Sequence, residues 1–219
     1  MKKGIFSDIF EFKILKLLLA IIFLYILFFA VSDYFIFTKS YYYSALSNQF
    51  AIARIDKILK EQENQKILFY ILPPILLCIK LILISSIIFI GTDLIGNEGI
   101  GLKNCFRIVL IAEIVPILFA FVKISYFLII PPQSLDDVRF FFPLSLIQVF
   151  NAKQIPSYLI YPLQLIGFFE IGYWVLLVIG INHFIKKGLK KSFLVLITTY
   201  GSALILWILL IAFLQLLYS

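Results

Sequence analysis

The chain has few of the residues that cover the surface of a water-soluble protein. Of its 219 residues, 14% are charged, whereas soluble domains average about a quarter. It contains one histidine, two cysteines and one methionine. These shortages exclude a water-soluble fold, and we expect neither a disulfide nor a metal site.

The sequence also lacks the short motifs that carry well-known chemistry. It contains no phosphate-binding loop, no HExxH pair and no Gly-x-Ser-x-Gly turn. Cys78 and Cys105 have no Cys or His neighbour at ligand spacing, and His183 has no partner for zinc or for a nucleophilic triad. We therefore expect that the protein is not an enzyme and that it carries no cofactor.

Long apolar runs occupy most of the chain instead. Hydrophobic residues make up 63% of the sequence and include 24 phenylalanines. Five runs exceed the ~20 residues that a helix needs to cross a bilayer. They lie at about residues 14–37, 67–91, 106–130, 160–185 and 192–217. The sequence predicts an all-α polytopic integral membrane protein, a five-helix transmembrane bundle that forms a single membrane domain over residues 1–219.

The segment between the first two runs has the pattern of an amphipathic helix. Across residues 44–66, the apolar residues Ile52, Ile55, Ile58 and Leu59 fall near one face, and most charged residues fall elsewhere. Such a helix either lies on the membrane, held by lipid headgroups, or offers a docking surface to a partner. Both interpretations remain open from the sequence.

A second segment, residues 131–159, is apolar but too short and too interrupted to span. It opens with Pro131-Pro132, Ser134 is suited to cap a helix, and Pro143 breaks the aromatic run that follows. We expect a re-entrant or interfacial segment. It forms either part of a substrate path or a lid packed on the outer end of the bundle.

The placement of lysine predicts the orientation. With the N-terminus in the cytoplasm, the cytoplasmic side holds more Lys and Arg, most densely in the short loop between the last two runs. That loop contains Lys186, Lys187, Lys190 and Lys191, which we expect to contact lipid headgroups. The net charge of +7 therefore indicates a lipid bilayer as partner, and no nucleic acid.

The first run, preceded by Lys2 and Lys3, resembles a secretion signal. We interpret it as an uncleaved anchor. The abundance of Ile, Lys, Phe and Tyr suggests an AT-biased bacterial genome. The expected location is a cell inner membrane, with the N-terminus cytoplasmic and the C-terminus on the far side.

Four ionisable residues lie well inside the runs: Lys80, Glu113, Lys123 and Glu170. A charge at the bilayer centre costs roughly 2.5 to 3.5 kcal/mol, so each is expected to face protein, water or an opposite charge. Their depths along the helices predict two pairs, Lys80 with Glu113 and Lys123 with Glu170. The pairs are either structural bridges that fix helix register or parts of an ion or proton pathway.

Three features of the C-terminal half form a family-like pattern. They are the run at residues 106–119 with its late Pro116, the run LIGFFEIGYWVLLVIGI at residues 165–181, and Lys190-Lys191-Ser192 before the last run. Together they resemble the Yip (Ypt-interacting protein) superfamily of five-span membrane proteins. The resemblance implies a cytoplasmic N-terminus, a far-side C-terminus and a non-enzymatic adaptor role.

Two functions follow as expectations. The first is a non-enzymatic scaffold or accessory subunit of a larger membrane complex, acting with a membrane-protein partner or as a homo-oligomer. The alternative is a transporter or channel component that uses the paired intramembrane charges. The two differ in whether the paired charges face a water-filled cavity or a dry helix interface, and a wet cavity open to one side would favour transport.

Overall fold

The computed structural model describes residues 13–47, 49–94, 99–150 and 155–217. Within these ranges the protein is helical throughout and has no strand. The elements are α2 (Ile14–Val31), η1 (Ser32–Ile36), α3 (Lys39–Leu46), α4 (Ile52–Asn64), α5 (Lys66–Leu94), α6 (Leu102–Ala112), α7 (Ile114–Ile129), α8 (Leu135–Phe140), η2 (Leu146–Val149), α9 (Ser157–Leu165), α10 (Phe168–Ile185), α11 (Leu189–Leu196), η4 (Ile197–Gly201) and α12 (Ser202–Leu217).

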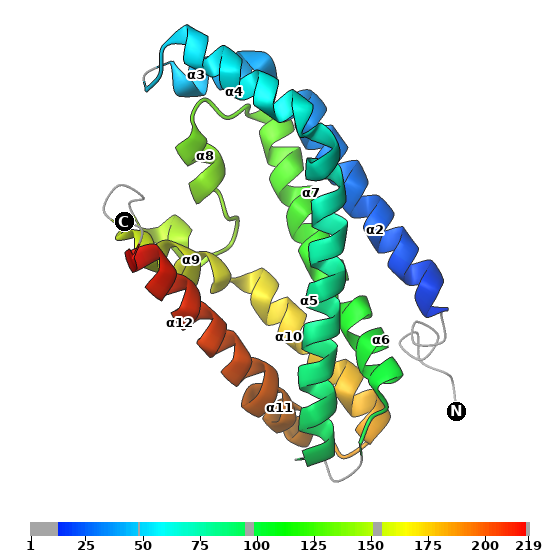
Figure 1. Cartoon of the computed structure of the whole chain (residues 1–219). Coiled ribbons are helices and arrows are strands. Elements are labelled where there is room, and N and C mark those ends of the chain that lie inside the picture. The colour runs from blue at the N-terminus through cyan, green and yellow to red at the C-terminus, as the bar shows by residue number, and fades with distance from the viewer. Residues whose placement is uncertain (1–12, 48, 95–98, 151–154, 218–219) are drawn as a thin grey trace.

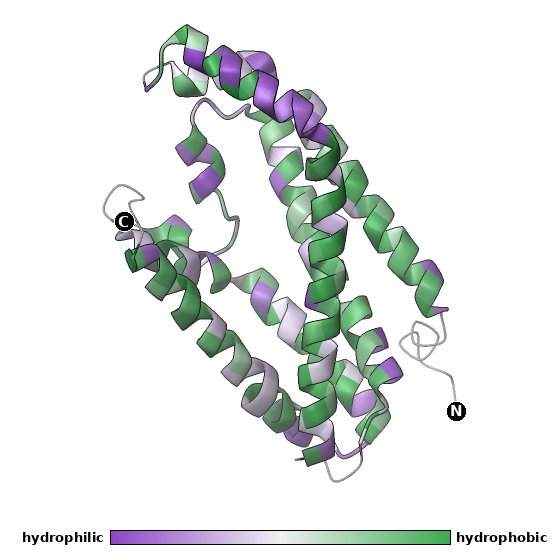
Figure 2. Cartoon of the chain, viewed as in Figure 1, coloured by the Kyte–Doolittle hydropathy of each residue, from purple (hydrophilic) through white to green (hydrophobic). Residues whose placement is uncertain are grey.

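Five helical segments are long and apolar enough to cross a membrane, which confirms the number expected from the sequence. They are Ile14–Ile36, Lys66–Leu94, Leu102–Ile129, Phe168–Ile185 and Leu189–Leu217. The fourth begins at Phe168, later than the predicted residue 160. Figure 2 shows apolar residues along most of the length of these helices, with hydrophilic ones near their ends.

Two spans are interrupted. The third changes from α6 to α7 at Glu113, three residues before Pro116, whose missing N–H cannot continue the helical hydrogen-bond ladder. The fourth predicted run is divided between α9 and α10 by the extended backbone of Gly167. A Cβ at Gly167 would lie 2.8 Å from the carbonyl oxygen of Leu144, so this close approach requires glycine.

The core lies where α5, α6 and α10 meet, near the lower end of the molecule in Figure 1. Leu81 on α5, Val109 on α6 and Leu177 on α10 are completely buried there. Close backbone approach helps this packing, because a Cβ at Gly180 would lie 2.5 Å from a side-chain carbon of Ile108. The third span contacts α2, α5 and α10 and is the middle of the bundle.

The last span packs differently from the others. At its start, α11 and the π-helical turn η4 contact α5, but α12 has no buried residue and packs chiefly on α9. Figure 1 shows α12 diverging from α5 toward the upper part of the molecule. This divergence leaves room beside α10 for the site described below.

The amphipathic helix is shorter than residues 44–66. The chain instead forms α3 and α4, which pack on each other above α2 and α5 (Figure 1). Near the end of α3, the hydroxyls of Ser44 and Ser47 donate hydrogen bonds to backbone carbonyls. Such side-chain bonds compete with the backbone hydrogen bonds that would continue the helix. Ile55 of α4 is completely buried, so part of the apolar face is already covered by this chain.

Residues 131–150 do not span, as the sequence predicts. Ser134 caps α8 in a capping box with Asp137, which confirms its predicted role. Burial raises the pKa of Asp137. Hydrogen bonds with the backbone N–H groups of Gln133 and Ser134 and with the Ser134 side chain outweigh burial and hold that pKa below its usual value. Beyond α8, Phe141 stacks on Tyr126 of α7 at 4.0 Å between ring centroids. The segment therefore packs against one end of the bundle.

We predict that Gly180→Ala destabilises the protein by ~1 to 3 kcal/mol, because the added methyl overpacks the contact with Ile108. Gly172→Ala in the same helix is the matched control, since its Cβ would meet Val115 at an ordinary 3.5 Å. Unfolding in mild detergent measures both variants. Equal stability of the two would contradict the close approach of α10 and α6.

Candidate functional site

The structure brings Lys80 and Glu113 together. Lys80 Nζ on α5 lies 2.7 Å from Oε1 of Glu113, which sits at the junction of α6 and α7 and has no exposed surface. The hydroxyl of Tyr25 on α2 donates to Glu113 Oε2 at 3.2 Å, and that of Tyr173 on α10 donates to Oε1 at 3.4 Å. The carboxylate and its three partners thus come from four different spans.

Lys123 and Glu170 do not pair, contrary to the prediction from depth. Lys123 Nζ donates to the backbone oxygen of Val138 at 3.0 Å and lies 4.5 Å from the ring centroid of Phe142. The lysine therefore faces the segment around α8. Depth gives a position along a helix axis but not the face of the helix, and the two residues face different neighbours.

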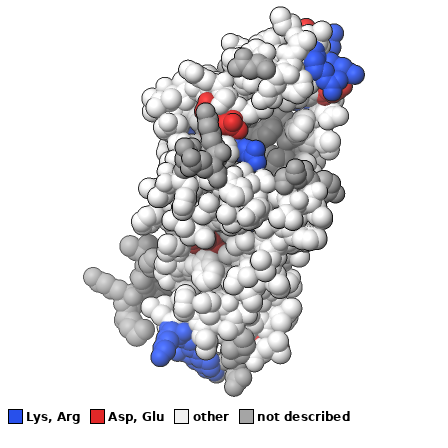
Figure 3. Space-filling view, turned by 90° about the vertical axis from the view of Figure 1, so that its left-hand side faces the viewer, with Lys and Arg blue, Asp and Glu red and all other residues white. Residues whose placement is uncertain are grey.

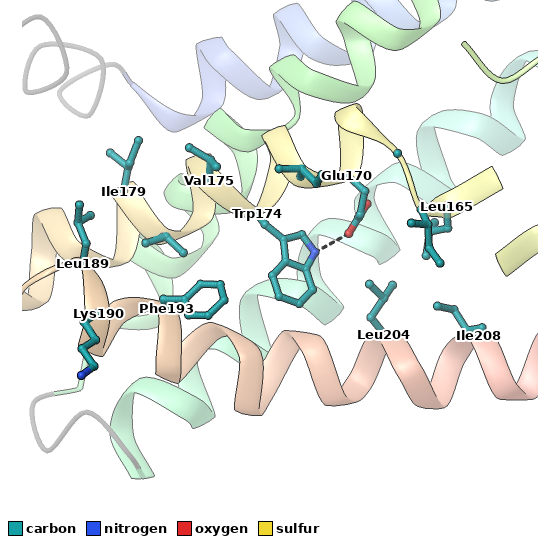
Figure 4. Close-up of a pocket in the computed structure, with 14 residues that line it drawn as sticks. Leu165, Glu170, Trp174, Val175, Ile179, Leu189, Lys190, Phe193, Leu204 and Ile208 are labelled. Atoms are coloured by element: carbon teal, nitrogen blue, oxygen red, sulfur yellow. Dashed lines mark hydrogen bonds between the residues drawn. The ribbon is translucent and has the colours of Figure 1, made fainter. Parts of the chain in front are cut away.

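Glu170 is held by neutral donors instead. Trp174 Nε1 donates to Glu170 Oε1 at 2.7 Å, and the hydroxyl of Tyr200 donates to the same oxygen at 3.0 Å. Figure 4 shows the indole nitrogen of Trp174 directed at this carboxylate. Glu170 lies in the first turn of α10, where the helix dipole favours a negative charge. In the described ranges no lysine, arginine or histidine forms a salt bridge with it.

A cavity of about 840 Å³ lies beside these groups. Its walls come from α2, α5, α7, α9, α10, η4 and α12, together with residues 142–145. Most of the lining is apolar. The residues that contribute polar groups include Tyr25, Lys80, Tyr161, Gln164, Glu170, Tyr173, Tyr200 and Trp207. Trp207 Nε1 of α12 donates to the Tyr161 hydroxyl of α9 at 2.9 Å across this wall.

The aromatic members of this site were not found from the sequence. Tyr173 and Trp174 follow Glu170 by three and four residues, a spacing that places side chains on one face of a helix. The contact of Glu170 with Trp174 could therefore have been predicted from the sequence. Tyr25 and Tyr200 lie on distant spans. Their approach to Glu113 and Glu170 depends on helix rotation, which the apolar pattern leaves undetermined.

The lysines predicted to contact headgroups lie at the turn between α10 and α11. Lys186 ends α10 in the left-handed conformation, with a φ of 56°, and Lys190 begins the next helix. Figure 3 shows Lys and Arg mainly toward the two ends of the molecule, and the band between them is mostly uncharged apart from a small acidic patch. This distribution suits a protein whose ends meet headgroups and whose middle meets hydrocarbon.

Nothing in the described ranges resembles a metal centre. No three His, Cys, Asp or Glu side chains gather there, and Cys78 and Cys105 are free thiols. Compared with protein-family models, with curated proteins and with solved structures, the chain matches none of them. The resemblance to the Yip superfamily therefore gains no support from these comparisons, and the site must be interpreted from its own geometry.

We predict that Lys80→Leu destabilises the protein by ~3 kcal/mol, because it leaves the buried Glu113 carboxylate without its cation. The double variant Lys80→Leu, Glu113→Gln recovers much of this loss. Lys123→Leu is the matched control, since it removes one hydrogen bond and should cost only ~1 kcal/mol. Denaturant titration in mixed micelles measures all three; a Lys80→Leu protein as stable as the control would rule out a structural pair.

Proposed function

We propose that this chain is a non-enzymatic, multi-pass protein of a bacterial inner membrane that binds a small organic cation in its cavity and moves it. The observation that carries the proposal is Glu170, a carboxylate on the cavity wall that forms no salt bridge with a described residue. The N-terminus lies in the cytoplasm and the C-terminus on the far side, as the lysines of the α10–α11 turn favour.

The charge balance of the cavity favours a cation. Lys80 and Glu113 neutralise each other at 2.7 Å, which leaves Glu170 as the excess charge. Both hydrogen bonds that it accepts from described residues come from neutral donors and end on Oε1. A cationic ligand would supply the opposite charge that an intramembrane carboxylate requires.

The walls favour a cation with an apolar body. Rings of Tyr25, Phe119, Tyr173, Tyr200 and Trp207 line the cavity, and aromatic faces attract cations by ~2 kcal/mol when water is excluded. Much of the remaining lining is aliphatic, for example Leu76, Leu83 and Leu204. An inorganic ion would leave this apolar surface without a contact, whereas an organic cation would cover it.

The helix breaks support movement of the ligand as well as binding. Discontinuous helices beside the binding site are typical of transporters. Here α6 and α7 meet at Glu113, and α10 begins two residues before Glu170. Both breaks adjoin the cavity. Charges that face a cavity are the feature that favours transport over a scaffold.

The binding test uses tetraphenylphosphonium as probe and tetraphenylborate, an anion of the same shape, as its control. We expect the purified protein to bind the cation, and Glu170→Gln to weaken binding about tenfold or more. Glu61→Gln on exposed α4 is the matched carboxylate control and should bind as the parent does. Equal binding of both probes, or an unchanged Glu170→Gln protein, would refute the proposal. Reconstituted vesicles then show whether the bound cation crosses the membrane.

The accessory-subunit function stays a prediction. The interpretation of α4 as a docking surface is less favoured, because Ile55 is buried and Ile58 and Leu59 are partly covered within this chain. Purification from the native host in mild detergent, followed by mass spectrometry, tests for a partner. A stoichiometric companion would establish a subunit role, whereas a homo-oligomer would place the function in this chain alone.

A further inference from the structure

A second hollow lies on the other side of Glu170, and its character differs from that of the cavity. It is a groove of about 780 Å³ between α10 and the α11–α12 segment. Figure 4 shows the aliphatic and aromatic side chains that face it, among them Val175, Ile179, Phe193, Leu204 and Ile208. Among the described residues, the only charged side chains that line the groove are Glu170 at one end and Lys190 at the other.

The length of the groove matches one leaflet of a bilayer. Its wall on α10 runs from Gly167 to Ile179, which corresponds to ~18 Å of helix rise. Half of a ~30 Å hydrocarbon core is ~15 Å. An extended acyl chain that starts at the lysine end would therefore be long enough to follow the groove to its Glu170 end.

The charge at the mouth of the groove selects the headgroup. Lys190 lines the groove and is exposed, and it forms no ion pair with a described residue. Lys186 at the end of α10 and Lys191 in the first turn of α11 add positive charge to this end of the molecule. A basic mouth leading into an apolar groove is complementary to a phosphate group attached to an acyl chain.

We propose that the groove is a binding site for one anionic phospholipid, with its phosphate at Lys190 and one acyl chain along α10 as far as Trp174 and Glu170. The inference does not depend on the proposed cation transport, because it concerns lipid binding at Lys190 and along α10, although Glu170 lines both hollows. A helix of a partner protein or of a second copy would fill the groove differently, since it would bring no phosphate to Lys190.

The two tryptophans of the chain permit a direct test. Trp174 lines the groove, whereas Trp207 lines the cavity, so Trp207→Phe leaves Trp174 as the single tryptophan, which can be excited selectively at the red edge, where the tyrosines do not absorb. The probes are phosphatidylglycerol and phosphatidylcholine with brominated acyl chains, which quench a tryptophan on contact. We expect the anionic lipid to quench Trp174 at about fivefold lower mole fraction than the zwitterionic lipid, the preference that one lysine gives.

Two further measurements keep the result interpretable. Lys190→Gln in the Trp207→Phe background should abolish the difference between the lipids, while Lys60→Gln on α4 should leave it unchanged. High salt should reduce the preference in the parent, because it screens the lysine–phosphate attraction. Equal quenching by both lipids would overturn the headgroup assignment. No quenching by either lipid would mean that the groove is closed to acyl chains, which would overturn the proposal entirely.

Discussion

The Glu113 carboxylate is the constraint on which the central packing depends. It has no exposed surface, and a carboxylate in that position is tolerable only when its oxygens are fully partnered. The partners come from three other spans: Lys80 of α5, Tyr25 of α2 and Tyr173 of α10. In hydrocarbon, apolar contacts between helices have no advantage over contacts with lipid, so this polar cluster does more than leucine packing to fix how four spans face one another.

The same cluster explains why a cavity lies beside the core. Below the level of Glu113, α10 approaches α6 closely, with Ile108 against Gly180, and η4 approaches α5 closely, with Thr199 against Gly91. Above it, α12 leaves α5 and packs on α9, and the hydrogen bond from Trp207 to Tyr161 joins these two helices. The cavity lies where α12 diverges.

Much of this fold can be predicted from hydropathy, because a span must be apolar and about 20 residues long wherever it sits. The pairing of Lys80 with Glu113 follows from depth. The pairing of Lys123 with Glu170 does not occur, because depth omits rotation about the helix axis, and the carbonyl of Val138 is a partner that belongs to no predicted span. The start of α10 at Phe168 was missed for a related reason: the interruption depends on Gly167 fitting against Leu144, a contact between distant segments.

Glu170 connects the two proposed sites physically. Together with Leu165, Gly167 and Leu204 it lines both the groove and the cavity, so α10 presents one carboxylate at the boundary of two hollows. The two proposals therefore make demands on the same side chain, because an acyl chain that reaches Glu170 and a cation bound at Glu170 would contact one carboxylate. The extended backbone of Gly167, which precedes α10, lies at this boundary between the two hollows.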